Sequence, residues 1–116
     1  MLASKNRFHG TNSLNYVYRN GKTLRTKYMA VKYCPNSRRD TYRIAVVVSR
    51  KVAKSAPVRN RIRRRIYELF RTQQIAGLSN LDIVVTVFDE NVAELSAENL
   101  KNTVDQLVSD MTSEPQ

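Results

Sequence analysis

The chain has 116 residues, a net charge of +10 and a pI of about 10.2. Its length predicts one domain over residues 1–116, with irregular ends at 1–10 and 112–116. No apolar run approaches the roughly 20 residues needed to span a bilayer, and the first residues lack the apolar core of a signal peptide. Cys34 is the only cysteine and His9 the only histidine, which excludes an internal disulfide and metal sites built from cysteines or paired histidines. We therefore expect a cytoplasmic protein without a membrane partner.

The charge is divided unevenly along the chain. Residues 1–71 carry 19 Lys and Arg against two acids, whereas residues 72–116 carry one Lys against eight acids. A basic body with an acidic end is typical of a protein that binds nucleic acid on one face. A helix lying on a membrane is a weaker alternative, because the most basic segment is central rather than terminal.

The first half of the chain predicts a helix followed by two strands. Thr11, Asn12 and Ser13 are candidate N-caps for a short helix with Leu14, Val17 and Tyr18 on one face. The pair Asn20-Gly21 predicts a left-handed stop. Residues 27–34 and 42–49 have strand-like composition, and the second run is apolar enough to be buried on both faces. Cys34, at the end of the first run, is expected to be half-buried.

A strongly basic amphipathic helix follows the second strand. Pro57 suits its first position, where the missing N–H costs nothing. The helical spacing places an apolar stripe on one side: Val58, Ile62, Ile66, Leu69 and Phe70. The opposite side carries Asn60, Arg61, Arg64, Glu68 and Arg71, and the edges of the stripe carry Arg59, Arg63 and Arg65. Since Glu68 is the only acid available within the helix, this face favours neutralisation by a polyanion such as RNA.

The last third predicts a strand and a helix. Residues 81–88 form the third strand, and Ser96 caps a helix whose apolar stripe is Leu100, Val104, Leu107, Val108 and Met111. The order α-β-β-α-β-α predicts an α/β (α+β) two-layer sandwich. The acids near the third strand are interpreted as surface or helix-end charges rather than metal ligands: Asp82, Asp89, Glu90 and Glu94. We expect no metal site in this chain.

Aromatic residues are interleaved with the basic ones. Single-stranded nucleic acid is held by a basic groove together with aromatic faces on which bases stack. Those within strands are interpreted mainly as core residues: Tyr28, Tyr33 and Tyr42. Tyr18 is the better candidate for a base platform, and Phe8 is a second.

Two adjoining segments carry a family resemblance. Arg43-Ile44-Ala45-Val46-Val47-Val48-Ser49-Arg50-Lys51 is followed by Val58-Arg59-Asn60-Arg61-Ile62-Arg63-Arg64. Together they resemble the signature of the protein subunit of bacterial ribonuclease P. Three further segments are similar to that family: Asn6-Arg7-Phe8, Tyr18-Arg19-Asn20-Gly21 and Leu81-Asp82-Ile83-Val84-Val85.

The resemblance implies a fold and a function. The basic helix would lie in a left-handed β-α-β crossover, against the right-handed default. In this family an RNA subunit hydrolyses precursor tRNA with Mg²⁺ and releases the 5′ leader. We expect the protein to be a monomer, one copy per RNA, with no catalytic side chain and no cofactor of its own. It binds the RNA subunit and holds the single-stranded leader between its first helix and its sheet.

The resemblance also implies which residues do so. The expected contacts to the RNA subunit are Arg59, Asn60, Arg61, Arg63, Arg64, Arg65 and Lys54. The expected contacts to the leader are Leu14, Tyr18, Lys51, Arg50 and Phe8. Leu14 stands where many members have phenylalanine, so that position keeps apolar contact but loses base stacking.

Two alternatives remain open at this stage. Composition is also typical of a non-enzymatic RNA-binding module, such as a ribosomal protein or an RNA chaperone. A DNA-binding protein that reads the major groove with its basic helix is less favoured, because the apolar stripe runs along the whole helix.

Overall fold

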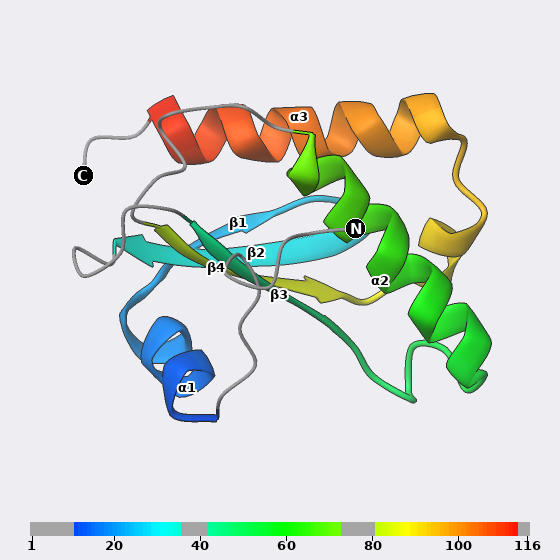
Figure 1. The fold of residues 1–116 in the computed structure, drawn as a ribbon, viewed down its shortest axis with the longest axis horizontal. Coiled ribbons are helices and arrows are strands. Elements are labelled where there is room, and N and C mark those ends of the chain that lie inside the picture. Colours follow the sequence, from blue (N-terminus) through cyan, green and yellow to red (C-terminus); the bar gives the residue numbers. More distant parts are fainter. Residues whose placement is uncertain (1–10, 36–41, 73–80, 114–116) are drawn as a thin grey trace.

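A four-stranded sheet separates one helix from the other two (Figure 1). This computed structural model describes residues 11–35, 42–72 and 81–113. The strands are β1 (Lys22–Arg25), β2 (Met29–Pro35), β3 (Arg43–Val48) and β4 (Leu81–Val87), in the spatial order β1-β2-β4-β3. The helices are α1 (Thr11–Asn20), α2 (Ala56–Arg71), the short 3-10 helix η3 (Glu90–Ala93) and α3 (Ala97–Ser113). Helix α1 lies on one face of the sheet, and α2 and α3 lie on the other.

The predicted fold class is confirmed, with additions to the element order. Strand β1 and helix η3 were not predicted. Strand β1 consists of four residues of which three are exposed, so it lacks the apolar alternation that marks a strand. The predicted irregular end begins too early, because α3 continues to Ser113. The predicted irregular start, residues 1–10, lies outside the described residues.

The sheet is mixed, and the basic helix α2 connects its two parallel strands. Strand β2 pairs antiparallel with both β1 and β4, whereas β3 and β4 are parallel neighbours joined through α2. This is the β-α-β unit that the resemblance implies. The left hand of the crossover stays a prediction.

Alternation along the strands gives each face of the sheet its own apolar cluster. On the core face, Val31 of β2, Val85 of β4 and Val46 of β3 lie in register and are buried beneath α2 and α3. On the opposite face, which we call the α1 face, Val84 and Ala45 lie in register and are buried against Val17 of α1. The central strands are therefore apolar on both faces, as predicted for residues 42–49.

Local signals placed the two long helices well. Ser55 caps α2, so Pro57 is the second helical residue rather than the first. The predicted stripe of α2 faces the core, with Ile62, Ile66 and Phe70 fully buried. The Ser96 hydroxyl accepts a hydrogen bond from the Asn99 amide at 3.1 Å, which confirms the predicted cap of α3.

Helix α1 ends before Gly21 for a different reason than the predicted left-handed conformation. The φ angle of Gly21 lies outside the left-handed range, so the predicted left-handed stop is wrong. Instead, a β carbon at Gly21 would lie 2.6 Å from the Val17 carbonyl oxygen and 3.0 Å from that of Tyr33. Glycine is needed here because the end of α1 passes this close to the backbone of β2.

Candidate RNA-binding surface

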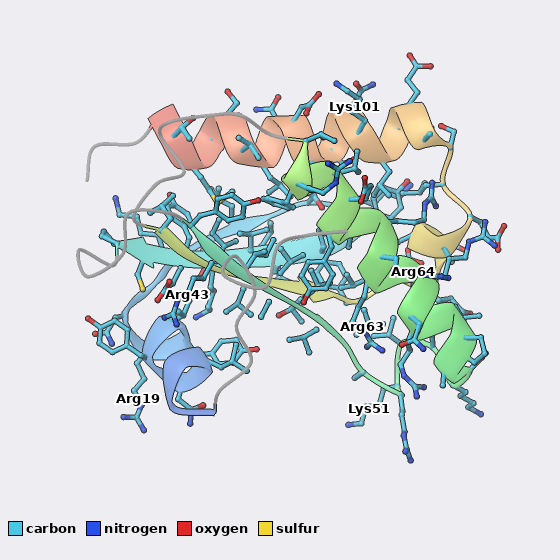
Figure 2. The ribbon with its side chains drawn as sticks, viewed as in Figure 1. Arg19, Arg43, Lys51, Arg63, Arg64 and Lys101 are labelled. Carbon is cyan, nitrogen blue, oxygen red and sulfur yellow. The ribbon has the colours of Figure 1, made fainter. Side chains whose placement is uncertain are left out.

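The exposed side of α2 carries the residues that the helical spacing predicted. Asn60, Arg61, Arg64, Glu68 and Arg71 are all exposed, and the three arginines at the edges of the stripe are half-buried. Figure 2 shows Arg63 and Arg64 on this helix, with Lys51 on the segment that leads into it. The predicted orientation of α2 is confirmed.

Five cations on and before α2 have side chains without a partner among the described residues. Within the described ranges, the side chains of Arg50, Lys51, Lys54, Arg61 and Arg64 make no hydrogen bond or ion pair, and all five are exposed. We call this set the basic strip. Because its donors are unused, it can bind phosphate oxygens without first breaking a contact within the protein.

The three arginines at the edges of the apolar stripe of α2 donate hydrogen bonds within the protein. The Arg59 guanidinium donates to the carbonyl oxygens of Ala53 and Lys54 at 2.8 and 2.9 Å, which fixes the segment before the helix. Arg65 donates to the carbonyls of Val92, at 2.6 Å, and Leu95, which fixes η3 against α2. Arg63 donates to the side chain of Asn60.

We expect Arg65→Ala to destabilise the fold and Arg64→Ala to leave its stability nearly unchanged. Loss of Arg65 leaves two carbonyls without their charged donor, so the free energy of unfolding should fall by about 1.5–3 kcal/mol. Loss of Arg64 removes no contact within the described residues and should leave stability within about 0.5 kcal/mol. Urea denaturation followed by circular dichroism measures both. Equal stability of the two variants would contradict the assignment of Arg65 to η3.

The acid of α2 is used within the helix. Glu68 and Arg71 form an exposed ion pair one turn apart, in which Nε of Arg71 lies 2.8 Å from the carboxylate. The hydrogen bond from Arg71 lowers the pKa of the Glu68 carboxyl. The Glu68 carboxylate therefore neutralises the charge of Arg71 in the last turn of α2. It forms no ion pair with Arg61 or Arg64.

The candidate leader residues come from two separate elements. Leu14 packs partly buried against the α1-face cluster, whereas Tyr18 is 39% exposed and Val17 fills the interface instead. The predicted common face of Leu14, Val17 and Tyr18 is therefore only partly correct. Lys32 of β2 donates to the Tyr18 carbonyl oxygen at 3.1 Å and tethers the end of α1 to the sheet. Phe8 lies outside the described residues.

Strand β3 runs from beneath α1 to the start of the basic strip. Its residue Ala45 lies in the cluster under α1, and its end at Val48 leads directly to Arg50 and Lys51. Leu14 and Tyr18 thus lie over one part of the α1 face, and the basic strip begins where β3 leaves the sheet.

Asp82 is a buried partner rather than a surface charge. Its carboxylate receives two hydrogen bonds from Arg43 of the neighbouring strand, at 2.9 and 2.8 Å, and the side chains are only 14% (Arg43) and 7% (Asp82) exposed. The predicted surface role of Asp82 is wrong. The same hydrogen bonds raise the pKa of Arg43. The pairing was hidden in the sequence, because 39 positions separate the two residues.

Cys34 lies beside this pair and is buried rather than half-buried. It is in register with Asp82 on the adjacent strand and only 4% exposed. Burial, with a smaller effect from the Asp82 charge, raises the pKa of the thiol. Cys34 is therefore an inert packing residue.

The aromatic residues of the two predicted strands 27–34 and 42–49 serve mainly as core residues, as predicted. Tyr33 is buried, and Tyr28 and Tyr42 pack partly buried against the core. The Tyr42 hydroxyl donates to the Phe70 carbonyl oxygen at 3.1 Å, and burial raises its pKa. The Tyr67 hydroxyl accepts from the Val46 amide at 3.1 Å, which satisfies a donor of the edge strand β3.

Among residues 11–35, 42–72 and 81–113, no three His, Cys, Asp or Glu side chains gather as a metal site would require. In the same ranges, none of the helices combines the length and the apolar character needed to cross a bilayer.

Known proteins are similar to this chain in sequence and in fold. The family model described as ribonuclease P matches residues 2–112. A protein named ribonuclease P protein component from Pseudanabaena sp. is 37% identical over 87 residues, which cover 75% of each chain. A protein of the same name from Caldanaerobacter subterraneus is 33% identical over 98 residues, covering 84% of this chain and 82% of the relative.

Solved structures agree on the fold. The ribonuclease P protein from Thermotoga maritima superposes with a TM-score of 0.78 at 23% identity, covering 95% of this chain and 98% of that one. The Staphylococcus aureus protein gives a TM-score of 0.78 at 22% identity, covering 90% and 93%. The family match over nearly the whole sequence, together with this shared sheet and helix arrangement, shows that the chain belongs to the ribonuclease P protein family.

Proposed function

We propose that this chain binds the RNA subunit of ribonuclease P through the basic strip and assists that RNA in removing the 5′ leader of precursor tRNA. The observation that carries the proposal is the basic strip, whose exposed side chains have no partner in the described part of the chain, in a member of the ribonuclease P protein family. In this proposal the RNA performs the hydrolysis with Mg²⁺. The protein contributes binding, one copy per RNA.

Arg61 and Arg64 would act on the RNA subunit by neutralising phosphates. RNA strands that crowd together repel each other, and Mg²⁺ ordinarily screens that repulsion. A rigid helix that presents guanidinium groups supplies part of the same screening, and each group can donate two hydrogen bonds to one phosphate. The RNA should therefore reach its active fold at a lower Mg²⁺ concentration when the protein is bound.

The α1 face would act on the substrate. Leu14 offers apolar contact and Tyr18 an exposed ring, while Arg50 and Lys51 offer charge where β3 ends. A single-stranded leader lying along this route gains contacts that mature tRNA cannot make. The protein would thus favour binding of the precursor and release of the product.

A single-turnover experiment tests the proposal. A precursor tRNA is cleaved by a bacterial ribonuclease P RNA at low Mg²⁺, with and without this protein. We expect cleavage at the mature 5′ end to become faster by at least about tenfold, since a single hydrogen bond to a charged group contributes about 1.5–3 kcal/mol. Salt-sensitive RNA binding without stimulation would contradict it and would favour the alternative of a general RNA-binding module.

A further inference from the structure

Phe88 is an exposed aromatic residue at the far end of the α1 face. It follows β4 directly, is 40% exposed, and continues the strand ladder through a hydrogen bond from its amide to the Tyr28 carbonyl oxygen at 3.1 Å. Since Val84 and Thr86 point to the α1 face, Phe88 lies on that face as well. The sequence pattern assigned it to the third strand and gave no sign that its ring would be exposed.

An arginine from the edge strand β1, on the same face of the sheet, covers this ring. The guanidinium carbon of Arg25, on the edge strand β1, lies 5.4 Å from the ring centroid of Phe88. Arg25 is itself exposed, and it is in register with Ala30 of β2 and through it with Thr86 of β4. The two side chains therefore form a preformed pair, held by three neighbouring strands, whose planar groups remain accessible.

The basic strip begins beside the same pair. Val48 and Val87 are partners in the parallel ladder, so the residues that follow them leave the sheet at the same end. Phe88 follows one of these strands, and Arg50 and Lys51 follow the other. The ring consequently lies between Arg25 on one side and the start of the basic strip on the other.

We propose that Phe88 and Arg25 form a base-stacking platform for the single-stranded leader, beyond the part of the sheet that α1 covers. The proposal rests on the proposed function and extends it. Val84, under α1, and Phe88 are four residues apart, or about 13 Å along the strand. A leader that contacts α1 would therefore reach Phe88 only if it is several nucleotides long. Bases stack on aromatic rings and on guanidinium planes regardless of their identity, so this contact reads leader length rather than leader sequence.

Substitutions at Phe88 separate stacking from packing. Phe88→Leu keeps an apolar side chain but removes the π face, and Phe88→Trp keeps a π face. For a precursor with a long leader, we expect Phe88→Leu to weaken binding to the holoenzyme by about fivefold to a hundredfold and Phe88→Trp to retain it. Mature tRNA and a precursor with a very short leader should bind all three proteins equally. A fluorescent adenine analogue moved along the leader should be quenched at one position in the wild type and not in Phe88→Leu.

Each other result has a defined meaning. Unchanged binding of the long leader by Phe88→Leu would overturn the platform, while the proposed function would stand if the wild-type protein still stimulates cleavage. An equal loss for mature tRNA would overturn the leader as the occupant of the platform. Failure of the wild-type protein to stimulate the RNA would overturn both the platform and the proposed function.

Discussion

Replacing Arg61 and Arg64 together by alanine is expected to weaken binding of the ribonuclease P RNA by about a hundredfold, because each guanidinium can make charge-assisted hydrogen bonds worth about 1.5–3 kcal/mol. The salt dependence should change as well. Loss of two phosphate contacts lowers the slope of log K against log salt concentration by roughly 1.5–2. Filter binding over a range of salt concentrations measures both quantities, and single-turnover cleavage at low Mg²⁺ measures the loss of stimulation.

The fold should be unaffected by this change. Neither arginine has a partner within the described residues, and removing like charges one turn apart favours the helix by about 0.2–0.5 kcal/mol per pair. Arg71→Ala/Lys101→Ala is the matched control. It removes the same charge from residues already paired with Glu68 and Asp105, and Figure 2 places Lys101 on α3, away from Lys51. An equal loss of affinity in both variants would show that the net charge attracts the RNA without a contact specific to Arg61 and Arg64.

Replacing Arg43 by methionine is expected to lower the free energy of unfolding by about 3–5 kcal/mol. The Asp82 carboxylate would keep its buried position but lose the two hydrogen bonds and the positive charge that Arg43 supplies. For a domain of this size the melting temperature should fall by roughly 10–20 °C. Urea denaturation and thermal melting, both followed by circular dichroism, measure the change.

A second substitution tests the physical reason. In Arg43→Met/Asp82→Leu the whole pair is replaced by apolar side chains, so no buried charge remains. We expect the double variant to recover most of the lost stability, since a buried ion pair contributes little beyond the cost of burying it. A loss below about 1 kcal/mol in the single variant would mean that water screens the pair. No recovery in the double variant would mean that lost packing, and not the Asp82 charge deprived of Arg43, caused the loss of stability.

Local periodicity was enough to place the two long helices. The stripe of α2 repeats at helical spacing, and the structure buries Ile62, Ile66 and Phe70 while leaving Arg61 and Arg64 exposed. The same holds for α3, where the cap and the stripe lie within one continuous segment. Such features depend on neighbours three or four positions away, so they can be read from the chain alone. The family could also be recognised from the sequence, because its signature lies within residues 43–71.

Strand β1 could not be predicted in this way. Its residues Lys22–Arg25 are polar and mostly exposed, and they form a strand because the edge of β2 offers backbone partners. The interaction that decides its conformation belongs to another strand. The exposed ring of Phe88 was missed for a related reason: a strand-like sequence shows that a residue is apolar, but not where the covering helix stops.

Which arginines bind within the protein and which remain available depends on contacts between segments that are distant in the sequence. Arg65 was expected on the RNA-binding face, yet its guanidinium holds carbonyls of Val92 and Leu95, 27 and 30 positions further along the chain. Arg43 and Asp82 are joined across 39 positions by the parallel pairing of β3 with β4. Composition and spacing established that this protein carries a dense cationic helix, and the segments within residues 43–71 indicated the ribonuclease P protein family. Which cations remain available to RNA depended on the tertiary structure, because a guanidinium is occupied or not according to the carbonyls and carboxylates that folding brings beside it.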